Sequence, residues 1–170
     1  EMSEELLNGL KKVHGDFNDV IEIAESSFSL SNRLSGTGKL DRQIALDHGV
    51  IGVTGRAIGI AHDARIEYPY AAYDRLKFEI ALEEEGDVRA RWSVRVKEVH
   101  SSMNIIEQAL RSIPLNDELI SGDETVLRSN SCGVGAAEGW RGDIVYFVAT
   151  DAEGEVSRVD VRDPSFINWT

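Results

Sequence analysis

The chain has 170 residues, of which 18 are basic and 30 are acidic, so its formal net charge is -12. This charge disfavours binding to nucleic acid or to anionic lipid headgroups, and no apolar run approaches the ~20 residues of a membrane-spanning helix. The single cysteine, Cys132, excludes a disulfide within the chain and fits a reducing compartment.

The N-terminal segment predicts one long amphipathic helix, capped at Ser3 and ending near Leu34. Its apolar residues recur at steps of three or four, as on one helix face: Leu6, Leu10, Val13, Phe17, Val20, Ala24 and Phe28. We expect this face to pack against another helix, because a single helix cannot bury it.

A short helix is predicted from Asp41, a natural cap, to His48, where Gly49 ends it. The segment 49–59 then contains four glycines in eleven residues. Such density indicates either a buried connection between helices or a backbone that another part of the molecule approaches closely. The sequence leaves both interpretations open.

Pro69 can open a short helix in the next segment. Phe78, Ile80 and Leu82 then alternate with charged or small residues, which predicts a brief strand. The acidic run 83–85 is typical of a solvated turn.

The strongest pattern of the chain lies between Gly86 and Pro114 and predicts a helix that organises the fold. Asp87 suits its N-cap, and Pro114 forces its end. Its stripe consists of Trp92, Val96, Val99, Met103, Ile106, Leu110 and Ile113, whereas Glu98 and other charged residues fall off the stripe and suit solvent or a polar partner. We expect this helix to pack antiparallel to the N-terminal one.

The C-terminal part predicts a small antiparallel sheet after a loop that runs to about Arg128. Residues 144–149 are apolar at every position, which indicates a strand covered on both faces. A turn at 151–154 leads to a return strand through Val156, Val159 and Val161, and 133–138 can add a third strand. The prediction is an α+β fold: a helical bundle over 1–120 around the long helix, with a β-hairpin appendage of the same domain over 121–170.

Chemistry is predicted at the glycine-punctuated corner 138–143, where Arg141 precedes the best strand. A guanidinium there could hold an anion or an oxygen-bearing ligand. On the residues alone an ion pair of Arg141 with Glu138 or Asp143 is the favoured interpretation. The four histidines lack the spacing of zinc ligands, and neither a dinucleotide fingerprint nor a Gly-x-Ser-x-Gly nucleophile motif occurs.

Seven blocks in fixed order nevertheless resemble one family. They start at Gly49 (GVIGVTGRAIG), Asp63 (DAR), Tyr68 (YPYAAYD), Gly86 (GDVRAR), Ile105 (IIEQAL), Ala137 (AEGWRGD) and Arg162 (RDPSF). The chain is similar to the large subunit of nickel-iron hydrogenases, and more so to the 49-kilodalton subunit of respiratory complex I. The ending at Arg162 most resembles the formate hydrogenlyase or hydrogenase-4 group.

The resemblance implies a helical bundle with a small β-structure, next to a cavity that holds a nickel-iron centre in hydrogenases and receives quinone in complex I. Arg56 and Arg141 match family arginines and are the predicted catalytic residues. The predicted residues that shape the cavity are Glu138, Asp143, Asp63 and Arg65. Departures at Ile58 and at Gly139-Trp140 put the setting of both arginines in question.

Hydrogenases bind their metals with two Cys-x-x-Cys pairs, whereas this chain has only Cys132. We therefore expect a piece of a longer protein that carries no cofactor or metal of its own and is inactive alone. The implied partners are an iron-sulfur small subunit and further subunits of a complex I or hydrogenase assembly, and not nucleic acid. The implied location is the cytoplasm, at the inner face of the cytoplasmic membrane without spanning it. A non-catalytic scaffold of the same shape is the alternative, and an unrelated acidic binding domain is the third interpretation.

Overall fold

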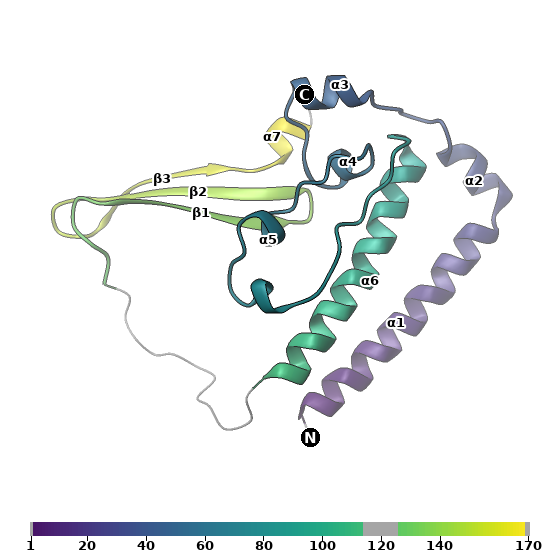
Figure 1. The fold of residues 1–170 in the computed structure, drawn as a ribbon, viewed down its shortest axis with the longest axis horizontal. Coiled ribbons are helices and arrows are strands. Elements are labelled where there is room, and N and C mark those ends of the chain that lie inside the picture. The colour runs from purple at the N-terminus through teal and green to yellow at the C-terminus, as the bar shows by residue number, and fades with distance from the viewer. Residues whose placement is uncertain (1, 114–125, 169–170) are drawn as a thin grey trace.

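The computed structural model describes residues 2–113 and 126–168. Two helices of equal length, α1 (Met2–Ser26) and α6 (Val88–Ser112), lie side by side and run antiparallel (Figure 1). A row of half-buried α1 residues with alternating steps of four and three faces this interface: Leu7, Leu10, His14, Phe17, Ile21 and Ala24. Across it, His14 Nε2 lies 2.9 Å from His100 Nδ1. The predicted helix pair is therefore confirmed.

The predicted N-terminal helix differs from the observed one in two details. Ser27 interrupts it and caps α2 (Phe28–Leu34) by accepting a hydrogen bond from the Leu30 amide. Ser3 lies inside α1 rather than at a cap. Four members of the predicted stripe are also more than half exposed, because the seam with α6 is narrower than the apolar face: Leu6, Val13, Val20 and Phe28.

Asp87 fixes the start of α6, as predicted. Its carboxylate accepts hydrogen bonds from Ala90 N at 2.8 Å and from Gly36 N at 2.6 Å, so the cap also holds the loop after α2. The most buried positions of α6 are Ala90, Val94 and Ile105, whereas the members of the predicted stripe are half-buried or exposed. The stripe lies off the deepest face because α4 packs against Ala90 and Val94.

The glycine-rich segment satisfies both interpretations left open by the sequence. It folds as α4 (Gly52–Arg56) after α3 (Arg42–Asp47), which Asp41 caps as predicted. Val53, Ala57 and the α6 residues Ala90 and Val94 form one core cluster, so the connection is buried. Gly52 also has φ of +66°, and a Cβ there would lie 1.9 Å from the Arg141 carbonyl oxygen. The segment that approaches Gly52 closely is therefore the corner between β1 and β2, at Arg141 and Gly142.

The strand predicted through Phe78, Ile80 and Leu82 does not form. After α5 (Ala64–Glu67) and a 3-10 turn, η1 (Tyr73–Arg75), the chain runs extended along α6 without joining a sheet. Side chains of α6 form hydrogen bonds with the main chain of this segment. Gln108 accepts from Lys77 N at 2.9 Å and donates to Lys77 O at 2.8 Å. The side chains alternate as predicted, but the side-chain amides of Asn104 and Gln108 on α6 supply hydrogen bonds that a neighbouring strand would otherwise supply. The expected helix after Pro69 is limited to η1.

The C-terminal sheet has the order β1 (Cys132–Gly139), β2 (Gly142–Thr150), β3 (Val156–Arg162), all antiparallel, and α7 (Ser165–Asn168) follows it. Figure 1 shows the sheet projecting from the helical body. The α+β prediction is confirmed. The expectation that both faces of residues 144–149 are covered is wrong, because Tyr146 is 48% exposed where the sheet projects. The predicted boundary at 120 and the start of the loop lie outside the described residues.

Candidate functional site

Arg56, at the last position of α4, is the centre of a buried group of charges. Its side chain is only 3% exposed. Nη1 donates to Glu138 Oε1 at 2.9 Å and to the His62 carbonyl at 3.1 Å, while Nε lies 2.7 Å from Glu98 Oε1. Asp63 Oδ2 lies 3.8 Å from Nη1. A cation this deep is stable only with such compensation.

Asp63 and Arg65 form the second part of the group. Arg65 donates from Nε at 2.9 Å and from Nη2 at 2.6 Å to the two oxygens of Asp63, which also caps α5 through Arg65 N. Burial raises the pKa of Asp63, but the hydrogen bonds and charge of Arg65 outweigh this effect, so the pKa lies below its ordinary 3.8. The Arg65 guanidinium also stacks 4.9 Å from the Phe78 ring centroid.

Glu138, on β1, joins the sheet to the helical body. Besides its bond to Arg56, it accepts from Ala64 N at 3.0 Å, and its own amide donates to Tyr70 Oη at 3.0 Å. The carboxylate thus satisfies the first amide of α5 and the buried cation together. The structure therefore brings four of the predicted site residues together: Arg56, Asp63, Arg65 and Glu138.

A cavity of about 330 Å³ opens beside this group, between α6 and the corner after β1. Arg56, Arg65, Glu98 and Glu138 form its polar wall. Its remaining lining is largely apolar: Val99, Met103, Ile106 and Trp140, with Ser102 and Gly139. The arrangement combines a fixed charged wall with an apolar one, as pockets for small organic ligands do.

Asp143 belongs to a second group of polar side chains, which lies next to the buried group around Arg56. It accepts from Arg162 Nη2 at 2.6 Å, and His62 Nε2 lies 3.4 Å from its other oxygen. His62 Nδ1 lies 2.8 Å from Glu67. The carbonyl of His62 accepts from Arg56, so one residue connects the two groups.

Arg141 lies apart from the buried group. It is exposed, its Nη1 lies 3.4 Å from Ser165 Oγ, and it lines two small cavities of about 130 and 120 Å³. The carboxylates expected to pair with it, Glu138 and Asp143, are held by Arg56 and Arg162 instead. The role of Arg141 in turnover remains a prediction.

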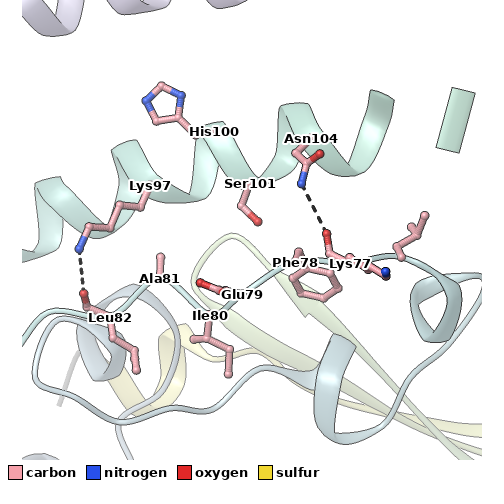
Figure 2. Close-up of a pocket in the computed structure, with 11 residues that line it drawn as sticks. Lys77, Phe78, Glu79, Ile80, Ala81, Leu82, Lys97, His100, Ser101 and Asn104 are labelled. Carbon is pink, nitrogen blue, oxygen red and sulfur yellow. Dashed lines mark hydrogen bonds between the residues drawn. The ribbon is translucent and has the colours of Figure 1, made fainter. Parts of the chain in front are cut away.

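A larger, open cavity of about 950 Å³ lies elsewhere, between the extended segment 76–82 and α6 (Figure 2). Lys97 Nζ donates to Leu82 O at 3.0 Å and Asn104 Nδ2 lies 3.4 Å from Lys77 O, so both bonds span it. Because its polar groups serve mainly to hold the segment, we assign the candidate site to the smaller cavity beside Arg56.

Two residues of the site, Glu98 and His62, are not among those predicted from the sequence. Glu98 falls off the apolar stripe, which indicates solvent or a polar partner. It stands on the same side of α6 as Val94, Ser101 and Ile105, at steps of four, three and four. This is the row that the structure buries most deeply, and it differs from the stripe predicted from the sequence. His62 has no periodic signal, because it lies in an irregular connection.

Metal-binding groups are not found in the part of the chain that the structure describes: no three histidine, cysteine or acidic side chains are grouped as a metal ion requires. Cys132, at the start of β1, is exposed. The residues present therefore do not fit a thiolate-bound nickel-iron or iron-sulfur centre. Among the described helices, none combines the length and the apolar character needed to cross a bilayer.

Comparisons with known proteins extend these observations. Residues 1–132 match the family model of the "Respiratory-chain NADH dehydrogenase, 49 Kd subunit". The chain is 34% identical to a carbon monoxide-induced hydrogenase of Rhodospirillum rubrum over 152 residues, which is 89% of this chain and 42% of that protein. It is 32% identical over 169 residues to an NADH-quinone oxidoreductase subunit of Herpetosiphon aurantiacus, covering 97% of this chain and 45% of the relative.

A solved structure is also similar: a chain of the membrane-bound sulfane sulfur reductase, described as an archaeal respiratory membrane complex. The TM-score is 0.87 at 29% identity, over 96% of this chain and 45% of that chain. The present chain thus spans less than half the length of these similar proteins.

Proposed function

Because this chain belongs to the family of the 49 kDa subunit of respiratory-chain NADH dehydrogenase, we propose that it forms part of the large subunit of a membrane-associated redox complex. The relatives carry the names of a hydrogenase and of an NADH-quinone oxidoreductase subunit, and the structural neighbour belongs to a respiratory membrane complex. The proposed role of this chain is to supply one wall of the reaction cavity, while the complete subunit is an oxidoreductase.

The observation that carries this proposal is the buried Arg56 at the edge of the 330 Å³ cavity. A permanently charged guanidinium fixed by Glu138 and Glu98 gives the cavity a preorganised electrostatic wall. Trp140 and Met103 in the apolar part of the lining suit a flat, mostly apolar ring that carries oxygens. These features support a quinone-like ligand.

A nickel-iron centre in the complete protein is the second possibility for the same cavity. The lone, exposed Cys132 does not fit its coordination, so the thiolate ligands would have to come from residues outside this chain. Formate hydrogenlyase, suggested by the C-terminal resemblance, falls under this possibility.

The proposed partners are an iron-sulfur subunit and further subunits of such an assembly. Electron transfer to a cavity requires a nearby redox centre, and the described residues do not supply the cysteines of one. The net charge of -12 repels anionic lipid headgroups, which supports attachment to a membrane through protein subunits rather than through lipid. We place the assembly at the inner face of the cytoplasmic membrane.

A non-catalytic scaffold is the alternative, and one observation favours it. The contacts of Arg56 with Glu138 and with the carbonyl of His62 join α4 to the sheet and to the connection before α5. The same cluster would be needed simply to hold these elements together.

The test uses the complete complex with two variants, Arg141→Ala and Trp140→Ala, and with Arg158→Ala as the control. Arg158 is an exposed arginine of β3 that pairs with Asp160, away from the cavity. Turnover per assembled complex is measured, and native electrophoresis checks assembly. We expect both variants to assemble and to turn over more slowly, with a higher KM for quinone in Trp140→Ala. Full activity of Arg141→Ala would reduce Arg141 to a structural residue, and full activity of both would favour the scaffold.

A further inference from the structure

The buried group around Arg56 does not balance its charges. Two guanidinium groups, Arg56 and Arg65, face three carboxylates, Asp63, Glu98 and Glu138. All five side chains are at most 16% exposed. An uncompensated negative charge at such a place is costly, and one bound proton would remove it.

The three carboxylates differ in the donors they receive. Asp63 accepts from Arg65 Nε, Nη2 and N, and Glu138 accepts from Arg56 Nη1 and Ala64 N. Glu98 Oε1 lies 2.7 Å from Arg56 Nε in a close ion pair that is poorly directed for a hydrogen bond, so among the described residues Glu98 has fewer well-directed donors than Asp63 or Glu138. Glu98 is therefore the carboxylate whose ionised form is least stabilised.

The position of Glu98 also gives a proton a route to it. Its side chain, 15% exposed, lines the 330 Å³ cavity, which is many times the roughly 30 Å³ that one water occupies in the liquid. Water in this cavity can therefore reach the carboxyl group.

The surrounding charges act on Glu98 in opposite directions. Burial raises its pKa above the ordinary 4.5, Arg56 of α4 and Arg65 of α5 lower it, and Glu138 of β1 raises it, with a net rise. On α6 itself, Arg95 is engaged by the ring of Trp140, with its Cζ 4.9 Å from the ring centroid. Burial and the third carboxylate thus outweigh the two cations.

We propose that Glu98 is a proton-binding site that exchanges one proton between its carboxyl group and water in the cavity beside Arg56. The protonated form balances the buried group, and the ionised form leaves it with one excess negative charge. The site depends only on contacts within this chain, so it stands or falls separately from the proposed redox role.

Nuclear magnetic resonance tests the site on the 170-residue chain, with 13C at the side-chain carboxyl carbon of glutamate. Glu98→Gln assigns the Glu98 signal, and Glu107→Gln assigns an exposed glutamate of the same helix as the internal control. Arg111 lowers the pKa of Glu107 through a hydrogen bond and its charge, so the two groups are expected to titrate on opposite sides of 4.5. Titration of Glu98 at or below the pH of Glu107 would overturn the proposal.

A stability series gives an independent readout. A carboxyl group with a raised pKa in the folded state binds more protons folded than unfolded between the two pKa values, so stability falls as pH rises through that window. Glu98→Gln loses this dependence, whereas Glu98→Asp retains a titratable group. The ratio of the wild-type to the Gln-variant unfolding constant should rise by up to about tenfold per pH unit in the window. A ratio that does not change with pH contradicts the site.

The wild-type chain offers a readout for the case in which no Glu98 variant folds. The infrared carbonyl band of protonated carboxylic acids is recorded as a function of pH above the ordinary glutamate value, where the contribution of exposed groups falls about tenfold per pH unit. A component equal to one carboxyl group that persists to higher pH than this decline supports the site, and a band that follows the decline of exposed groups alone overturns it.

Discussion

Replacing Gly52 by alanine should weaken the attachment of the β-sheet to the helical body. Gly52 has φ of +66°, and a Cβ there would lie 1.9 Å from the Arg141 carbonyl oxygen and 2.6 Å from Gly142 N. The left-handed backbone costs an L-residue about 1–2 kcal/mol, and forcing two packed backbones apart costs about 1–3 kcal/mol more. We therefore expect a loss of roughly 2–5 kcal/mol in the free energy of unfolding.

Gly49→Ala is the matched control, because Gly49 has φ of +65° with no atom within 4 Å of the added Cβ. It should show the conformational cost alone. Urea and thermal unfolding of both variants measure the difference, for which each 1 kcal/mol corresponds to about 2–4 °C in Tm for a chain of this size. If Gly52→Ala loses no more stability than Gly49→Ala, the close approach of the corner does not contribute and the reasoning is wrong.

Two further substitutions test other contacts. Asp87→Ala removes the cap of α6 and the bond to Gly36 N, so it should cost about 1–3 kcal/mol at neutral pH. The hydrogen bond from Gly36 lowers the pKa of Asp87, so the stability that the ionised Asp87 contributes is lost as pH falls through its folded-state pKa. The difference in unfolding free energy between the wild type and Asp87→Ala, measured with urea, should therefore become smaller in acid. A difference that does not change with pH would contradict this. His100→Ala removes the contacts with His14 and Phe17 and should cost about 1–3 kcal/mol, with faster amide exchange in α1. His48→Ala, at the exposed end of α3, is the control. If both variants lose the same free energy of unfolding, the contact between α1 and α6 at His100 does not contribute to stability.

Patterns carried by local physics could be predicted from the sequence. The caps at Asp41 and Asp87 hold because a carboxylate before a helix satisfies free amides wherever the helix packs. The hairpin of β2 and β3 follows from two segments rich in valine and aromatic residues on either side of a turn at 151–154. Such features depend on neighbours a few residues away.

The remaining features depend on partners far along the chain. The extended segment after η1 alternates as a strand does, but Asn104 and Gln108 of α6 bind its main chain. Arg56 was predicted as a site residue from a resemblance, while its partners Glu98 and Glu138 lie 42 and 82 positions away. Periodicity cannot show which carboxylate meets which cation, because tertiary packing decides it.

The anchors of that extended segment have a consequence for its length. Gln108 holds it at Lys77 and Lys97 holds it at Leu82, so eleven residue steps of the helix are matched to five steps of the extended segment. Eleven steps of about 1.5 Å and five steps of about 3.3 Å both span about 16.5 Å. The helix and the extended segment thus have equal lengths between the two anchors. An insertion or deletion of one residue in the extended segment would displace one anchor by about 3.3 Å and put it out of reach. This stretch, although irregular in appearance, has a fixed number of residues.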